Sequence, residues 1–270
     1  MTIILFHGLG SSKKQLNYIN NKKSDFVKQL EKIDKVYIPE IPYTNVYYYG
    51  EDKKMGKLYK KIDKLNYDDL SLDKYITNLY KSLDNNKYPA PYIVMGSSHG
   101  IYHACEFARQ FPNKVNYIVS LDGSWITNEL NKKRLLNWKN KEKIIPKISN
   151  QKELDDIINK IKSEKNNTVY IKMIFDYVRG THTKFVIKQK YEKLKTPFIT
   201  FRDYNSDTKD DKEMIDHNNN VIQENNILSK YKNNIIYVLL DASHIIWSKD
   251  NYKKTIIDTI YMFLSDYINN

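Results

Sequence analysis

The sequence predicts an α/β fold with a mostly parallel sheet of about six strands and helices on both faces. Short apolar runs alternate with longer segments whose apolar residues recur at helical spacing. Such alternation is typical of a parallel sheet that helices cover on both sides. A chain of 270 residues with 41% hydrophobic content is long enough to bury one large core. We therefore expect a single domain that carries an insertion.

The predicted elements follow one another along the whole chain. Apolar runs predict strands at residues 3–6, 35–39, 92–95, 115–121, 196–201 and 234–240. Helical spacing predicts helices at residues 24–33, 70–83, 101–111, 222–231 and 252–268. Ser71 has the side chain of an N-cap residue. The alternation breaks into charged, helix-like segments between residues 125 and 195, so we expect a core of residues 1–124 and 196–270 and an inserted helical cap of residues 125–195.

The charge of the chain invites a nucleic-acid function, but the kind of cation argues against it. The formal net charge is +12, and nearly all cations are lysines scattered among asparagines and carboxylates. Arginine, whose planar fork reads phosphates and bases, occurs only four times. We therefore expect no specific nucleic-acid partner.

Cysteine content and apolar run lengths bear on the compartment. Cys105 is the only cysteine, so no intrachain disulfide can form. The first apolar run is too short for a signal peptide, and no run is long enough to cross a bilayer. These observations predict a soluble, cytoplasmic protein, while nothing in the sequence predicts its oligomeric state.

The stretch Gly96-Ser97-Ser98-His99-Gly100 fits the pattern G-x-S-x-G. It follows an apolar strand and precedes a predicted helix, which is the context in which this pattern forms a sharp turn with a strained central serine. The backbone is crowded two residues before and two residues after that serine, and glycine at both positions relieves the crowding. Ser98 is therefore the candidate nucleophile, at a helix N-terminus whose dipole favours developing negative charge.

With this motif in its context, the sequence resembles the α/β-hydrolase superfamily over essentially its whole length. His7-Gly8-Leu9-Gly10, after the first strand, resembles the oxyanion loop of that superfamily, and residues 38–42 resemble the segment after its next strand. The resemblance implies that the backbone N–H groups of Leu9 and His99 form an oxyanion hole. It also implies a fold shortened at its N-terminus, because the chain starts at the oxyanion strand.

A serine hydroxyl needs a base at neutral pH, so a histidine must approach Ser98 in the fold. His244 is the candidate, because it follows the last predicted strand and preserves the order serine, acid, histidine that the resemblance implies. His99 and His103 are spaced to share a helix face, but no H-E-x-x-H pattern accompanies them. We expect His182, in the cap, and His217, in a polar loop, to be exposed to solvent.

The acid that orients the histidine is open among three residues. Resemblance places it after the strand before the last one, where Asp207 has the expected offset. Asp203 is second. The glycine that usually follows that strand is missing here, so the number of residues between the strand and the acid can differ. Asp122, after residues 115–121, is third, because some members of the superfamily carry the acid one strand earlier.

Together, the resemblance implies a serine hydrolase that cleaves a carboxylic ester or thioester without a metal or organic cofactor. The substrate is expected to be a small acyl compound, lipid-like or anionic, selected by the cap. Five aromatic residues of the cap are candidates for lining an acyl pocket, although aromatic residues in helices more often pack the core. These are Trp125, Trp138, Tyr170, Phe175 and Tyr177. The alternative is a non-catalytic ligand-binding or signalling protein on the same fold.

Overall fold

The computed structural model describes most of the chain. The described residues are 1–9, 11, 13, 16, 18–19, 22–43, 65–85, 87–140, 145–163, 168–204, 212–231, 234–241, 246 and 250–268.

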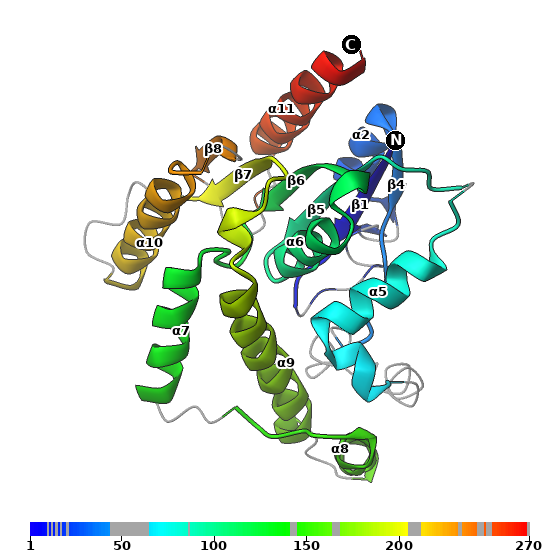
Figure 1. Cartoon of the computed structure of the whole chain (residues 1–270), viewed down its shortest axis with the longest axis vertical. Helices are drawn as coiled ribbons and strands as arrows, with labels where there is room; N and C mark the ends of the chain where they lie inside the picture. The colour runs from blue at the N-terminus through cyan, green and yellow to red at the C-terminus, as the bar shows by residue number, and fades with distance from the viewer. Residues whose placement is uncertain are drawn as a thin grey trace.

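A six-stranded sheet forms the centre of the molecule (Figure 1). Its strands, in spatial order, are β4 (Lys35–Tyr37), β1 (Thr2–Phe6), β5 (Tyr92–Ser97), β6 (Val115–Leu121), β7 (Phe198–Asp203) and β8 (Asn234–Leu240). Every neighbouring pair is parallel, so all carboxyl ends lie at one edge of the sheet. The predicted number and direction of the strands are confirmed. A short antiparallel pair, β2 (Tyr18–Ile19) and β3 (Lys22–Lys23), was not predicted.

Helices cover both faces of the sheet, as predicted. On one face, α5 (Leu72–Ser82) and α6 (Gly100–Gln110) pack over Ile4 and Phe6. On the other face, α2 (Asp25–Ile33) and α11 (Asp250–Ile268) pack over Ile3 and Leu5. Because side chains of a strand alternate between faces, a strand buried on both sides is apolar throughout, which explains the continuous run at residues 3–6.

Three helices lie between β6 and β7 and confirm the predicted helical insertion (Figure 1). They are α7 (Asn128–Asn140), α8 (Gln151–Ser163) and α9 (Thr168–Gln189), followed by the 3-10 turn η3 (Tyr191–Lys193). The domain boundaries at residues 124/125 and 195/196 stay predictions. None of the described helices is long and apolar enough to cross a membrane.

The start of α10 differs from the sequence prediction, whereas the predicted N-cap Ser71 is confirmed. Helix α10 spans Lys212–Leu228, so it begins ten residues before the predicted start at residue 222. Its first half is rich in polar residues and asparagine, which have low helix propensity and hide the helical pattern. Ser71 is the N-cap of α5, but its hydroxyl binds the Asp73 carboxylate rather than a helix N–H. Two further 3-10 turns are η1 (Tyr67–Leu70) and η2 (Pro112–Lys114).

Candidate active site

Ser98 occupies a sharp turn between β5 and α6. Its φ angle of 50° lies in the left-handed region, which costs a non-glycine residue about 1–3 kcal/mol. Backbone hydrogen bonds hold the turn in place. The Ser98 N–H donates to the carbonyl of Leu121 (3.3 Å), and the Ser98 carbonyl accepts from the N–H groups of Ser124 (2.8 Å) and Ile101 (3.3 Å). The strained serine is thus fastened both to the end of β6 and to the first turn of α6.

Glycines at positions 96 and 100 make this turn possible. A β-carbon added at Gly96 would lie 2.4 Å from the backbone nitrogen of Ile101, and one at Gly100 would lie 2.4 Å from the carbonyl oxygen of Phe6. Both contacts are with backbone atoms, which cannot move aside without shifting a strand or a helix. The spacing of the motif therefore has a steric cause in this chain.

We expect Gly100→Ala to lower the free energy of unfolding by about 1–3 kcal/mol, because it overpacks α6 against β1. Urea unfolding, followed by circular dichroism, measures the loss. Gly180→Ala in α9 is the comparison, because the three atoms nearest its added carbon, at 2.5–2.8 Å, belong to the side chain of Ile145, which can change rotamer, and the change also favours the helix. Equal losses in the two variants would contradict the steric argument.

The loop after β1 runs directly beside the serine. A β-carbon added at Gly8 would lie 2.9 Å from Cβ and 3.5 Å from Oγ of Ser98. The carbonyl of Gly8 accepts hydrogen bonds from the Ser11 N–H (3.2 Å) and from Nδ1 of His7 (3.2 Å). Within the described part of the chain, no hydrogen bond uses the backbone N–H of Leu9 or of His99.

Two candidate acids lie together at the carboxyl edge of the sheet. Asp122 follows β6 with a φ angle of 44°, and Asp203 ends β7. Both are buried, and the Asp203 N–H donates to Oδ1 of Asp122 (3.2 Å). Asp203 pairs in register with Leu240, the last residue of β8, four positions before His244. Asp207 and His244 themselves lie outside the described residues, so their roles stay predictions.

Comparison with solved structures identifies the architecture. The RedJ thioesterase from the prodiginine biosynthetic pathway in Streptomyces coelicolor superposes with a TM-score of 0.52 at 10% identity, over 97% of this chain and 89% of that chain. A monoacylglycerol lipase of Paleococcus ferrophilus gives 0.51 at 12% identity, over 97% and 93%. The α/β hydrolase enzyme MGS-MChE2, from a lagoon-sediment metagenome, gives 0.52 at 17% identity, over 98% and 91%. The chain has the α/β-hydrolase fold. No protein-family profile and no curated protein sequence matches it.

In this α/β-hydrolase fold, a histidine of the cap is bonded to the serine turn. Nε2 of His99 lies 2.9 Å from Nδ1 of His182 in α9, and Nε2 of His182 lies 3.0 Å from the carbonyl of Leu70. A carbonyl can only accept, so Nε2 of His182 donates to Leu70, and Nδ1 of the neutral His182 ring accepts a hydrogen bond from the Nε2–H of His99. The prediction that His182 is exposed to solvent is wrong, since its exposed fraction is 1%.

Two more buried histidines complete a cluster of four behind the serine turn, which we call the histidine cluster: His7, His99, His103 and His182. The Nε2 atom of His103 lies 2.6 Å from the hydroxyl of Tyr43, and the N–H of Ile41 donates to Nε2 of His7 (3.4 Å). Burial lowers the pKa of His7 and of His182 to about 4 and holds those of His99 and His103 well below 6.5. No group of three or more potential ligands among the described residues is arranged to hold a metal ion.

On the opposite side of the serine turn, Arg202 joins two buried carboxylates. Its guanidinium lies 3.4 Å from Asp122 and 3.5 Å from Glu224 of α10, and donates to the carbonyl of Gly123. It also stacks on Trp125, with 4.2 Å between its central carbon and the ring centroid. Burial raises the pKa of the Glu224 carboxyl, and the charge of Arg202 offsets part of that rise. Asp122 is thus engaged in a buried ion pair with Arg202.

Sequence reasoning missed His182, Arg202 and Glu224. An arginine directly after the apolar run Phe198-Ile-Thr-Phe201 was a detectable signal, because a cation at the end of a buried strand needs a buried partner. His217 was expected in a solvent-exposed loop, but it lies half-buried in α10 and donates to the carbonyl of Asp203 (3.1 Å). Its position beside a candidate acid could not be read from the sequence.

Proposed function

We propose that the chain is a serine hydrolase that cleaves a carboxylic ester or thioester through an acyl-enzyme on Ser98. The observation that carries the proposal is the strained backbone of Ser98 at a strand-to-helix turn, with Gly8 packed against its side chain. Strain of this kind persists only where the surroundings enforce it, and it is concentrated at functional sites. Thioesterases and lipases among proteins of the same fold make this reaction class the best supported.

In the proposed mechanism, His244 takes the proton of Ser98 while Oγ attacks the acyl carbon. The N–H groups of Leu9 and His99 then stabilise the oxyanion. Collapse of the intermediate expels the alcohol or thiol, which takes the proton from His244. Water next attacks the acyl-enzyme and gives a proton to His244, and the acid is released as the bond to Oγ breaks and His244 returns the proton to Ser98. Asp207, or Asp203 in its place, orients the imidazole and stabilises its cation.

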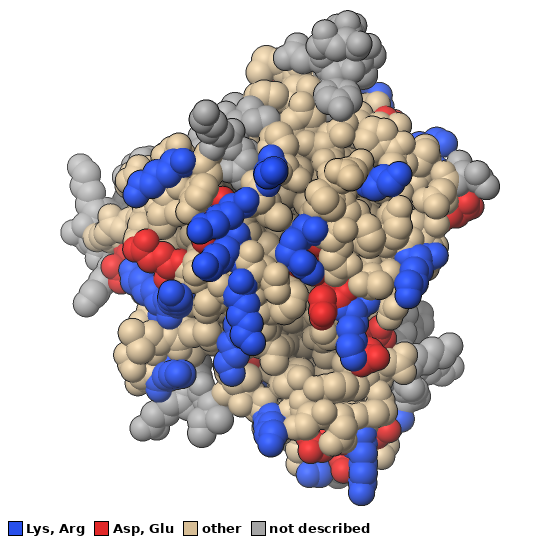
Figure 2. Space-filling model, in the orientation of Figure 1, with Lys and Arg blue, Asp and Glu red and all other residues tan. Residues whose placement is uncertain are grey.

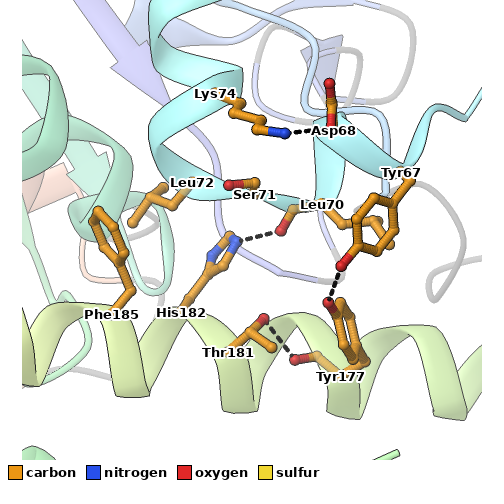
Figure 3. Close-up of a pocket in the computed structure, with 10 residues that line it drawn as sticks. All are labelled: Tyr67, Asp68, Leu70, Ser71, Leu72, Lys74, Tyr177, Thr181, His182 and Phe185. Carbon is orange, nitrogen blue, oxygen red and sulfur yellow. Dashed lines mark hydrogen bonds and ion pairs between the residues drawn. The ribbon is translucent and has the colours of Figure 1, made fainter. Parts of the chain in front are cut away.

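A pocket of about 310 Å³ between α5 and α9 is the proposed site for part of the acyl substrate (Figure 3). Its walls include Leu70, Leu72 and Phe185, and its volume is in the range of small-ligand sites. His182 lines it and is bonded to His99, the residue after Ser98, so the pocket adjoins the serine turn. Tyr177, one of the five predicted aromatic residues, also lines this pocket, where its hydroxyl lies 3.4 Å from that of Tyr67.

Labelling with a fluorophosphonate probe, followed by peptide mapping, tests the nucleophile. We expect a covalent adduct on Ser98 in the wild-type protein and none in Ser98→Ala. In His244→Ala the labelling rate should fall by at least about 100-fold, which is the usual contribution of a general base.

Ser97→Ala is the matched control, because Ser97 is adjacent but buried at the end of β5. It should label at the wild-type rate if its fold is intact by circular dichroism. An adduct elsewhere than on Ser98, or labelling that does not depend on His244, would contradict the mechanism. A folded protein that does not label at all would favour a non-catalytic binding protein.

A further inference from the structure

A second pocket lies between α7 and α10 and has a different chemical character. It encloses about 250 Å³. Its walls include two tryptophans, two cations and two asparagines, namely Trp125, Trp138, Lys133, Arg134, Asn137 and Asn220. No carboxylate is among the described residues that line it. The pocket therefore offers hydrogen-bond donors and positive charge together with flat aromatic surfaces.

Positive charge also lies behind the aromatic walls. The guanidinium of Arg179 lies 5.1 Å from the ring centroid of Trp138, and that of Arg202 lies 4.2 Å from the ring centroid of Trp125. The charge of Arg202 is balanced by its two buried carboxylates, whereas Lys133 has a neutral partner, Oδ1 of Asn220 (2.9 Å). Figure 2 shows that Lys and Arg predominate over Asp and Glu on the face that carries α6, α7 and α9.

Two walls of this pocket are fastened to the serine turn. Trp125 directly follows Ser124, whose N–H donates to the carbonyl of Ser98 (2.8 Å). Arg134 donates to the hydroxyl of Tyr102 (3.2 Å), and the Tyr102 ring packs edge-on against the ring of His99, with centroids 4.8 Å apart. Hydrogen bonds and ring packing therefore connect the walls of this pocket to the serine turn.

We propose that the pocket between α7 and α10 binds a carboxylate of the substrate, so that the preferred substrate is a half-ester or half-thioester of a dicarboxylic acid. This inference rests on the proposed function. The guanidinium of Arg134 can donate to both oxygens of a carboxylate, and Lys133 adds a second positive charge. The asparagine amides supply neutral donors, and the tryptophan faces cover the alkyl chain between the carboxylate and the ester. A neutral ester of equal length would bring no negative charge to Lys133 and Arg134, whose hydrogen-bond partners Asn220 and Tyr102 are neutral.

Paired substrates test the proposal. We expect the wild-type protein to hydrolyse mono-(4-nitrophenyl) adipate with a kcat/KM about tenfold above that for 4-nitrophenyl hexanoate, which has the same chain length without the charge. Lys133→Glu and Arg134→Gln should each lower this ratio about tenfold. Lys132→Glu is the control, because it makes the same charge change on the same helix at an exposed residue outside the pocket. An equal fall in Lys132→Glu and Lys133→Glu, or no fall in Lys133→Glu, would overturn the proposal.

A binding measurement separates this proposal from the proposed function. In Ser98→Ala, titration with monomethyl adipate should change the tryptophan fluorescence saturably, while methyl hexanoate should not, because Trp125 and Trp138 line the pocket. Lys133→Glu in that background should raise Kd about tenfold. Saturable binding by a protein that neither labels nor hydrolyses esters would refute the proposed function and support the carboxylate pocket. Ester hydrolysis without charge preference, and without saturable binding, would refute the pocket alone.

Discussion

Replacing Arg202 with methionine is expected to lower the free energy of unfolding by about 3–5 kcal/mol, which is the usual cost of removing one partner of a buried ion pair. The side chains of Asp122 and Glu224 are 3% and 2% exposed, so neither can recover hydration when the guanidinium is lost. Methionine fills much of the volume, so the loss reports the charge rather than a cavity. Urea unfolding at pH 7 measures it.

Two comparisons isolate the electrostatic cause. Lys254→Met removes an exposed partner of Asp258 and is expected to leave the free energy of unfolding almost unchanged, because water screens this pair. The double variant Arg202→Met/Glu224→Gln should recover part of the loss, because it removes one of the uncompensated charges. A loss that is unchanged by Glu224→Gln would show that Arg202 acts through packing on Trp125 instead.

The pH dependence of this loss has a definite sign. Burial raises the pKa of the Glu224 carboxyl above its unfolded value, and removing Arg202 raises it further. Folded Arg202→Met therefore takes up a proton at a higher pH than the unfolded chain does. The difference in stability between wild type and variant should narrow as the pH falls from 7 toward 5.

The sequence predicted those parts of the structure that depend on local pattern. The alternation of apolar runs with helical patterns located all six strands, and β1, β5 and β7, which are buried throughout, have the longest unbroken burial. The positions of Gly96 and Gly100 predicted a tight turn, although only the crowding at Gly96 is local, since a β-carbon at Gly100 would meet Phe6 of β1. Helix α10 was misplaced because no side chain at residues 215–220 is buried, and its polar composition masks the helical repeat.

The parts that escaped prediction depend on contacts between distant residues. His99 and His182 are 83 residues apart, and nothing in either local sequence indicates that an imidazole of the cap bonds to the serine turn. The sequence predicted that the helix containing Glu224 begins at residue 222, whereas α10 begins at Lys212. The ion pair between Glu224 and Arg202 could not be predicted without the correct position of α10. The choice of the orienting acid stays open for the same reason. Asp203 and Asp207 are only four residues apart in the sequence, and the path of the loop decides which of them can reach the histidine.

Acid is expected to destabilise the protein well above the pH at which carboxylates protonate. The four side chains of the histidine cluster are buried and neutral, with pKa values below the unfolded value of about 6.5. The unfolded chain therefore binds more protons below pH 6.5. The contribution of these four histidines to the free energy of unfolding is complete above that pH. It is lost as the pH falls toward 4, by about 1.4 kcal/mol per pH unit for each histidine. For His7 and His182, whose pKa is about 4, the total loss is about 3 kcal/mol each.

The bonding pattern explains why the cluster cannot accept a proton without rearrangement. Two hydrogen bonds link His99, His182 and the carbonyl of Leu70 in a row. Nε2 of His99 donates to Nδ1 of His182, and Nε2 of His182 donates to the carbonyl. A proton added to Nδ1 of His182 would set two N–H groups against each other at 2.9 Å. Protonation therefore opposes the contact between the cap helix α9 and the serine turn.

Urea unfolding between pH 5.0 and 7.0 measures this effect in a range where most carboxylates stay ionised. We expect the free energy of unfolding to fall steeply with pH in the wild type. In His182→Gln the slope of the free energy of unfolding against pH should correspond to about one proton fewer taken up on unfolding, because glutamine does not titrate in this range. If the wild-type free energy of unfolding stayed constant over this range, the four imidazole rings would be hydrated or protonated in the folded protein. That result would contradict their placement in the core.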